Sequence, residues 1–411
     1  MPEFLELMPV QQALDLFLTQ LPVKVGEELL PVEDSLGRVT RRDVYAPHPL
    51  PEFRRSTVDG YAVRAVDTHG ASDSLPAYLH CIGEVPMGGA PNFEIEANEC
   101  AIIHTGGMIP EGADAVIMVE ETQDAGSGEI ELFKSVGVGE NIIEKGEDVS
   151  EGELVISGGT VLRPAEIGGL MALGITEIQV SQKPRVGIIS SGDEVVPPRE
   201  DPRPGEVRDV NSYTLGSLVD KAGGLPVHYG IIADNRQAMQ DALRKAQEEC
   251  SLVIVTAGSS ASSRDLTSRV MDDLGKPGVL VHGVNVKPGK PTILAVAENT
   301  ALIGLPGNPV SALVIANLFV VPVIQQYLGV RRERPRPTVQ AELQINVSSS
   351  SGREDWVPVK LARKKNGGYQ AVPVFGKSNL IFILSRADGL FRIPAEANGI
   401  NAGQTVTVRL I

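Results

Sequence analysis

Between residues 184 and 330 the chain alternates short apolar runs with longer stretches in which apolar residues recur at helical spacing. The apolar runs predict strands at residues 186–189, 227–232, 252–256, 293–296 and 301–304. The helical spacing predicts helices at residues 213–222, 236–249, 266–274 and 310–327. Strands that alternate with helices form a mostly parallel sheet with right-handed crossovers. We therefore expect a doubly wound α/β domain in this part of the chain.

A chain of 411 residues is too long for one hydrophobic core, at roughly 150 residues per domain. Residues 9–18 and 162–174 both show helical spacing, and we expect these two helices to pack together. The intervening stretch is rich in glycine, proline and short β-branched runs, which predicts an inserted β unit. A proline-rich linker at residues 331–337 leads into short alternating runs, which predict a small barrel-like β domain.

The expected fold class is therefore multi-domain α/β plus β. The predicted domains are a discontinuous linking domain (1–46 with 150–182), an inserted β domain (47–149), the α/β domain (183–330) and a C-terminal β domain (331–411).

Charge and composition exclude several classes of partner. A net charge of −15 would repel a nucleic-acid backbone. No apolar run approaches the roughly 18 residues of a membrane helix, and the acidic N-terminus does not resemble a secretory signal. The three cysteines lack CxxC spacing, and the six histidines lack zinc-binding spacing. We expect a cytoplasmic protein with no membrane or nucleic-acid partner.

Polar or glycine-bearing loops follow the predicted strands. In an open α/β sheet, ligands bind beyond the carboxyl ends of the strands. The loops in question are residues 190–194, Asp234, residues 257–265, residues 287–291 and residues 304–309. Five such loops on one edge predict a binding site there.

Two of these loops suit anions. Gly258, Ser259 and Ser260 could hold a phosphate through backbone N–H groups and hydroxyls, or form a serine-rich turn that caps a helix. Lys287 and Lys290 flank a proline and a glycine, so that both ammonium groups could converge on one anion or remain solvated.

Carboxylates follow three of the predicted strands. Glu194, Asp234 and Asp265 could together hold a hard cation such as Mg²⁺, which keeps several waters and bridges to phosphate. Alternatively, these three carboxylates cap helices or are simply exposed charges. We favour the metal site. Without a metal and an anion to bind, the three carboxylates and the two lysines Lys287 and Lys290 would form a cluster of mixed charge with no function.

Taken together, the motifs closely resemble those of the molybdopterin molybdenumtransferase family, the molybdenum insertases that include the E domain of gephyrin. The resemblance covers essentially the whole chain. It depends on Asp59-Gly60-Tyr61-Ala62, Thr105-Gly106, Gly112-Ala113-Asp114-Ala115, Gly139-Glu140-Asn141, Gly146-Glu147-Asp148, Ser191-Gly192-Asp193-Glu194, Lys287-Pro288-Gly289-Lys290-Pro291 and Gly304-Leu305-Pro306-Gly307-Asn308-Pro309-Val310-Ser311.

The resemblance implies an elongated homodimer of four-domain protomers. Such an enzyme binds molybdate and adenylylated molybdopterin made by an upstream adenylylating enzyme, cleaves the phosphoanhydride with the help of Mg²⁺, and releases molybdenum cofactor and AMP.

The matched motifs also imply roles for individual residues. Molybdate would be held by Lys287, Lys290, Arg353 and Ser378. The nucleotide or the magnesium ion would be bound by Glu194, Asp234 and Asp265. Further substrate contacts would come from Ser191, Gly192, Gly258, Ser259, Ser260, Pro306, Gly307 and Asn308. The partner protomer would supply Asp59, Thr105 and Asp148, and the catalytic group would be Asp59, Asp265, Lys287 and Lys290.

The chain also departs from the family pattern. Its residues 257–265 replace a glycine-rich loop, Gly283 stands where a lysine is common, and Val58 with Arg54 and Arg55 replaces a methionine and a polar segment. These changes fit a paralogue that uses another metal oxyanion, for example tungstate, or a modified dithiolene substrate. A catalytically silent scaffold, as in gephyrin's role in receptor clustering, is a further alternative. The retained lysines and carboxylates favour an enzyme.

Overall fold

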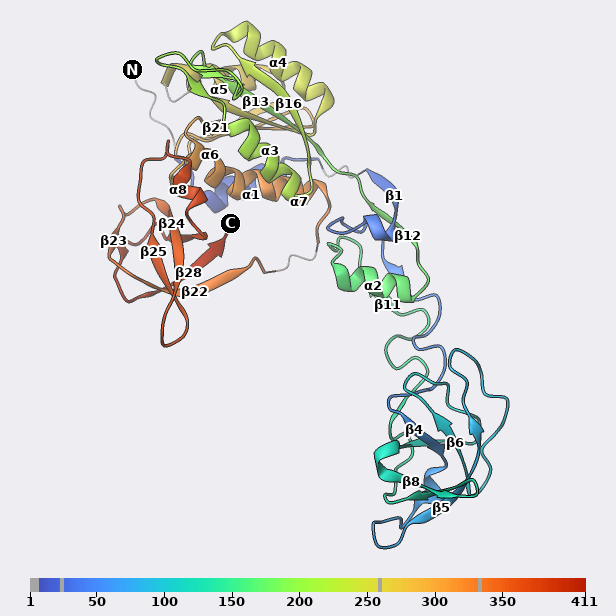
Figure 1. Cartoon of the computed structure of the whole chain (residues 1–411). Helices are drawn as coiled ribbons and strands as arrows, with labels where there is room; N and C mark the ends of the chain where they lie inside the picture. Colours follow the sequence, from blue (N-terminus) through green and yellow to red (C-terminus); the bar gives the residue numbers. More distant parts are fainter. Residues whose placement is uncertain (1–6, 23–25, 258–260, 332–334) are drawn as a thin grey trace.

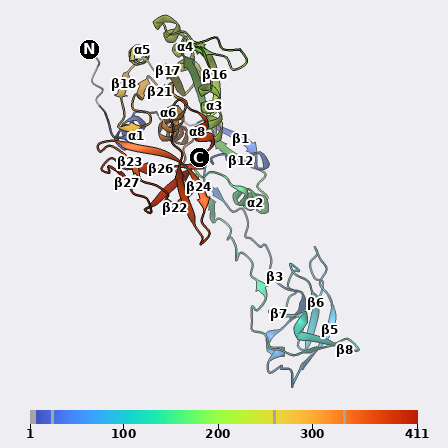
Figure 2. The same ribbon diagram turned by 60° about the vertical axis from the view of Figure 1, so that its left-hand side comes forward.

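A computed structural model describes residues 7–22, 26–257, 261–331 and 335–411 of the chain. Figures 1 and 2 show an elongated molecule with an α/β unit and a C-terminal β unit side by side at one end. A β unit formed by the first third of the chain lies at the other end, and a slender middle unit connects the two ends.

The α/β unit contains a six-stranded sheet with the order β16-β13-β17-β21-β20-β18. Its strands are β13 (Arg185–Ser191), β16 (Leu225–Ile232), β17 (Leu252–Ala257), β18 (Pro277–His282), β20 (Ile293–Ala297) and β21 (Thr300–Pro306). The first four strands in this order pair in parallel, whereas β20 pairs antiparallel with β21 and with β18. The prediction of a mostly parallel sheet is confirmed, with an antiparallel edge added to it.

Helices cover both faces of this sheet. They are α3 (Asn211–Lys221), α4 (Arg236–Glu249), α5 (Ala261–Asp273), α6 (Pro309–Ile315), the π-helical turn η4 (Ala316–Val320) and α7 (Val321–Tyr327). Helices α4 and α5 pack on one face, and α3 with the α6–η4–α7 run packs on the other. The sheet is therefore doubly wound, as predicted. The π turn precedes Pro322, which has no N–H to continue the helical ladder.

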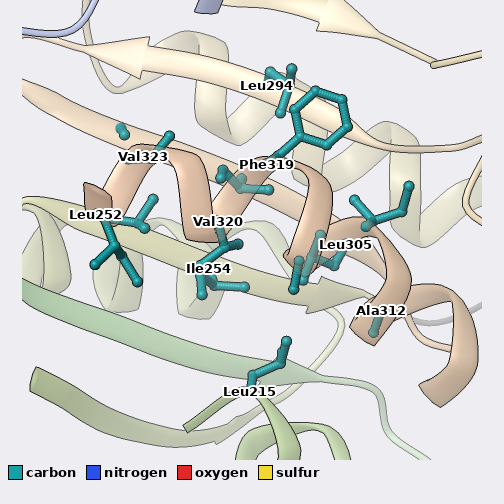
Figure 3. Close-up of a cluster of buried hydrophobic side chains, with 14 of the residues drawn as sticks. Leu215, Leu252, Ile254, Leu294, Leu305, Ala312, Phe319, Val320 and Val323 are labelled. Atoms are coloured by element: carbon teal, nitrogen blue, oxygen red, sulfur yellow. The ribbon is translucent and has the colours of Figure 1, made fainter. Parts of the chain in front are cut away.

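The α6–η4–α7 run is the buried centre of the molecule. Figure 3 shows Phe319, Val320 and Val323 from this run among Ile254 and Leu294 of the sheet, and all five side chains are fully buried. The 19 residues Pro309–Tyr327 have a mean hydropathy of 1.7 over their most apolar window, which is 61% buried. The expectation that no apolar run approaches membrane-helix length is wrong here, because a helix that packs deep in a core is apolar over most of its surface.

The helices predicted at residues 9–18 and 162–174 do not pack together, contrary to the prediction. Helix α1 (Val10–Thr19) buries Ala13 and Phe17 in the core of the α/β unit. Helix α2 (Pro164–Ala172) instead buries Leu170 in a separate small core. That core is completed by two antiparallel strand pairs, β1 (Glu27–Pro31) with β12 (Glu177–Ser181) and β2 (Val44–Tyr45) with β11 (Leu154–Ile156). Periodicity revealed the apolar face of each helix but not the surface that it contacts.

The distal β unit contains a second six-stranded sheet with the order β7-β4-β6-β5-β9-β8. Its strands are β4 (Gly60–Val63), β5 (Ala77–Glu84), β6 (Glu99–Ile103), β7 (Ala115–Met118), β8 (Thr122–Gly126) and β9 (Glu129–Leu132). Apolar clusters cover both faces of this sheet. A small pair adds β3 (Arg55–Ser56) and β10 (Ile142–Ile143).

The C-terminal unit is a closed five-stranded barrel. Its strands follow the order β24-β25-β22-β28-β26, and β26 pairs back with β24. They are β22 (Thr338–Leu343), β24 (Glu354–Arg363), β25 (Tyr369–Pro373), β26 (Gly389–Ile393) and β28 (Thr405–Leu410). The barrel-like β domain is confirmed. Strand β19 (Val286–Lys287) of the α/β unit pairs in parallel with the start of β24 and joins the two units.

Candidate functional site

A cavity of about 600 Å³ lies between the α/β unit and the barrel. It brings together the four residues that the sequence assigned to the oxyanion, although they come from three separate segments. The residues of this oxyanion cavity that carry polar or charged side chains include Lys287, Lys290, Ser311, Ser348, Arg353, Asp355, Lys377 and Ser378.

The loop that carries the two lysines is held in one conformation. Gly289 has a φ of 115°, and a Cβ at this position would overlap the side chain of Ile315. The hydroxyl of Thr292 donates a hydrogen bond of 2.7 Å to the carbonyl of Gly289. Only glycine combines this backbone conformation with such a close approach to a helix. The loop therefore presents Lys287 and Lys290 from a rigid turn.

A buried carboxylate organises the cations of this cavity. Asp355, which is 4% exposed, accepts a hydrogen bond of 2.9 Å from Nε of Arg353. Its other oxygen lies 3.8 Å from Nζ of Lys287. Alternation along β24 places residues 353 and 355 on the same side of the strand. With Lys290 and Lys377 also present, the cations outnumber this carboxylate, so that the cavity favours an anion.

Ser378, the serine assigned to the oxyanion, is oriented by the loop after β21. Nδ2 of Asn308 donates a hydrogen bond of 3.0 Å to Oγ of Ser378, and the N–H of Val310 donates to the Ser378 carbonyl. Because Oγ already accepts this bond, its own O–H can donate to a ligand. Asn308, predicted to contact substrate, also positions Ser378.

A second polar cluster lies at the carboxyl ends of β13 and β16. The hydroxyl of Ser191 donates a hydrogen bond to Oδ1 of Asp234, and the N–H of Asp234 donates to Oδ1 of Asp193 at 3.1 Å. Gly192 has a φ of 149°, and a Cβ there would lie 2.8 Å from Oε2 of Glu194. The structure thus brings together the predicted residues of two adjacent strand ends.

Sequence reasoning missed a buried polar network beneath this cluster. The hydroxyl of Ser190 donates to Oδ2 of Asp209 at 2.9 Å, and the N–H of Ser212 donates to Oδ1 at 3.1 Å. Nδ2 of Asn211 donates a hydrogen bond of 2.8 Å to the carbonyl of Gly307, next to Pro306 at the end of β21. These bonds fix the ends of three elements, and no local sequence pattern distinguishes them from an ordinary helix start.

The predicted metal ligands do not form a preformed cage. Within the described residues, no group of three His, Cys, Asp or Glu side chains is placed to hold a metal ion. Asp265 lies on α5, and Glu194 follows β13. Mg²⁺ commonly uses one or two carboxylates together with waters and substrate phosphates. The Asp193, Glu194 and Asp234 loops fit that weaker requirement. Predicted residues Gly258, Ser259 and Ser260 lie outside the described part of the chain.

The three remaining predicted residues lie in the distal β unit. Asp59 Oδ1 accepts hydrogen bonds from the N–H and hydroxyl of Thr105, at 2.7 and 3.0 Å. The backbone bond, then the hydroxyl bond, holds the pKa of Asp59 below its ordinary value, and His104, 3.8 Å away, adds to this effect. Asp148 lies on an exposed loop of the same unit.

Within one chain these residues do not line the oxyanion cavity. Figure 1 places β4, which follows Asp59 directly, at the opposite end of the molecule from β24 of the barrel. The structure therefore separates two sets of predicted residues, one around the oxyanion cavity and one around Asp59.

Family models match nearly the whole chain. Residues 8–174 match the MoeA N-terminal region (domain I and II), residues 187–326 match a domain described as "Probable molybdopterin binding domain", and residues 340–411 match the MoeA C-terminal region (domain IV).

Individual relatives and solved structures agree with these matches. The molybdopterin molybdenumtransferase of Haemophilus influenzae is 32% identical over 98% of both chains, and that of Bacillus subtilis is 33% identical over 94% of this chain and 91% of its own. The crystal structure of the molybdopterin biosynthesis moeA protein from Pyrococcus horikoshii OT3 has a TM-score of 0.86, is 32% identical, and covers 99% of this chain and 100% of its own. The chain belongs to the MoeA family of molybdopterin molybdenumtransferases.

Proposed function

We propose that this protein is a molybdopterin molybdenumtransferase that inserts molybdate into adenylylated molybdopterin and releases AMP, in molybdenum cofactor biosynthesis. The observation that carries the proposal is the convergence of Lys287, Lys290, Arg353 and Ser378 on one cavity. The full-length matches to relatives of this name support it. A separate adenylylating enzyme would supply the substrate. A cytoplasmic location fits the three free cysteines.

Molybdate is a tetrahedral dianion that needs fixed donors. Lysine and arginine side chains supply charge-assisted hydrogen bonds, and the Ser378 hydroxyl supplies a directed donor. Asp355 keeps the cations in place before the anion arrives. Preorganised donors of this kind stabilise negative charge without reorganisation during reaction. Tungstate has the same charge and shape, so this cavity suits either oxyanion.

The nucleotide end of the substrate would extend toward the carboxyl ends of the sheet. Ser191, Gly192 and Asp234 lie there, with Pro306, Gly307 and Asn308 leading from that edge to the oxyanion cavity. Asp234, Glu194 and Asp265 would hold Mg²⁺ together with substrate phosphate and waters. The metal would supply positive charge to offset the charge that departs with AMP.

A homodimer would complete this site. Asp59, Thr105 and Asp148 lie apart from the oxyanion cavity in their own chain, and we infer that the partner protomer brings the same three residues to it. Asp59 is suited to work as an ionised carboxylate, because two donors from Thr105 stabilise its charged form. Such a group can orient or deprotonate a water or a substrate hydroxyl.

The function is tested with purified protein, Mg²⁺, adenylylated molybdopterin and molybdate. We expect molybdate-dependent AMP release and a product that reconstitutes an apo-molybdoenzyme. The Lys290→Ala variant should lose this activity, whereas Lys360→Ala, an exposed lysine of β24 outside the cavity, should retain it. An equal rate of AMP release with and without molybdate would exclude the proposal. Tungstate in parallel reactions identifies the preferred oxyanion, and removal of Mg²⁺ should slow AMP release.

A further inference from the structure

A second, larger cavity of about 1020 Å³ lies on the other side of the barrel wall from the oxyanion cavity. Its described walls come from α1, from η4 and α7, from residues 329–331 and 335–336, and from strands β22, β24, β26 and β28 of the barrel. Five arginines line it, two of them from the linker after α7: Arg41, Arg331, Arg336, Arg392 and Arg409. We refer to it as the arginine cavity.

The carboxylates of the arginine cavity do not balance these charges. Asp15 and Glu354 are the two acidic residues among its described lining residues. Glu354 accepts hydrogen bonds from Nε1 of Trp356 at 2.7 Å and from Arg392 at 3.2 Å, while Asp15 accepts one from Gln11 at 2.8 Å. An excess of positive charge in one cavity contrasts with the net charge of −15 of the whole chain.

Three of the arginines influence one another. Burial first, and then the charges of Arg336 and Arg392, lower the pKa of Arg409. The Arg409 guanidinium lies 4.8 Å from the centre of the Trp356 ring, which holds it in a fixed orientation. Groups placed in this way gain a counter-ion when an anion binds.

We propose that the arginine cavity is a second anion site, which takes a phosphate-bearing small molecule of nucleotide size. Arginine forks match phosphate oxygens, and several of them around one volume select a polyphosphate over a single small anion. The volume lies at the upper end of the range for small-molecule pockets. Leu14, Leu18 and Val330 add an apolar wall suited to a base or sugar.

Strand β24 separates the two cavities. Arg353 and Asp355 line the oxyanion cavity, Glu354 lines the arginine cavity, and Trp356 lines both. Alternation of side chains along a strand explains the arrangement. The site is independent of the proposed catalytic chemistry, because it needs neither molybdate nor molybdopterin.

The test uses Trp356, the one tryptophan of the sequence, as a fluorescent reporter. The intact protein is titrated with ADP in the absence of metal and molybdopterin. We expect a saturable change in Trp356 emission that pyrophosphate reverses by competition. Arg336→Ala and Arg41→Ala, from separate segments, should each weaken binding about tenfold or more, since each removes a charged hydrogen bond.

Two controls separate this site from the others. Lys290→Ala removes a cation of the oxyanion cavity, and Arg363→Ala removes an exposed arginine of β24 that lines neither cavity. Both should bind ADP like the unaltered protein, and near-ultraviolet circular dichroism verifies the folding of every variant. The proposal is overturned if ADP gives no saturable signal, if pyrophosphate does not compete, or if Arg336→Ala and Arg41→Ala bind ADP as the unaltered protein does.

Discussion

Lys287 on β19 stands directly opposite Asp355 on β24, and its ammonium nitrogen lies 3.8 Å from the buried carboxylate. This relationship joins the α/β unit to the barrel at the point where the oxyanion cavity forms. The same carboxylate also accepts a hydrogen bond from Arg353. One residue thus fixes two of the cations that we assign to molybdate.

Replacement of Asp355 by asparagine should therefore destabilise the barrel. The amide keeps the size of the side chain but loses the charge that pairs with Arg353 and Lys287, which should cost about 1–3 kcal/mol of unfolding free energy. Urea unfolding followed by the emission of the neighbouring Trp356 measures this loss. An unchanged midpoint would show that Asp355 does not organise these cations.

The turn between the two lysines should not tolerate a side chain. Gly289→Ala places a methyl group against Ile315 and imposes backbone strain, so we expect both lower stability and loss of molybdate-dependent AMP release. Gly352→Ala is the matched control, because Gly352 has a φ of 91° but no atom within 4 Å of the added methyl. Equal effects of the two substitutions on AMP release would show that strain alone, and not the contact with Ile315, explains the loss.

The hydroxyl of Thr105 should tune the acidity of Asp59. Thr105→Val removes one of the two donors, so the pKa of Asp59 should rise toward its ordinary value, whereas Thr105→Ser should leave it low. Titration of labelled aspartate carboxyls by NMR measures the shift.

The sign of the corresponding pH dependence follows from this low pKa. A carboxylate whose pKa is lower in the folded protein contributes stability above its unfolded pKa and loses that contribution as pH falls through its folded pKa. If Asp59 acts in its ionised form, the acidic limb of AMP release should move to higher pH in Thr105→Val. An acidic limb that stays in place would separate Asp59 ionisation from the reaction.

Sequence patterns predicted the α/β unit well, for physical reasons. Buried strands such as β17 are continuous apolar runs, and helices such as α4 have one clear apolar face. Both kinds of element can therefore be recognised from their own stretch of sequence. The partner of each face is a tertiary property. Helix α1 therefore packs on the α/β core rather than on α2, and the antiparallel hairpin of β20 and β21 was not distinguished from parallel strands.

The candidate site shows the same limit. Lys287, Lys290, Arg353 and Ser378 carried a family pattern and do converge on one cavity. The sequence around Asp355 gives no indication of its role, because that role depends on the pairing of β19 with β24. The arginine cavity was also not predicted from the sequence, because Arg331 and Arg336 of the linker meet Arg41, Arg392 and Arg409 only in the folded chain. The three proposed metal carboxylates were chosen because they come after predicted strands in the sequence. Within the described residues, however, no three such side chains are close enough to hold a metal ion.

The central claim is that the oxyanion cavity of one protomer works with Asp59 of its partner. The most direct measurement is molybdate-dependent AMP release by purified heterodimers of Asp59→Ala and Lys290→Ala chains, each inactive as a homodimer. In such a heterodimer one site keeps both residues and the other lacks both, so we predict about half the activity of the unaltered dimer. No activity in verified heterodimers would contradict the shared site.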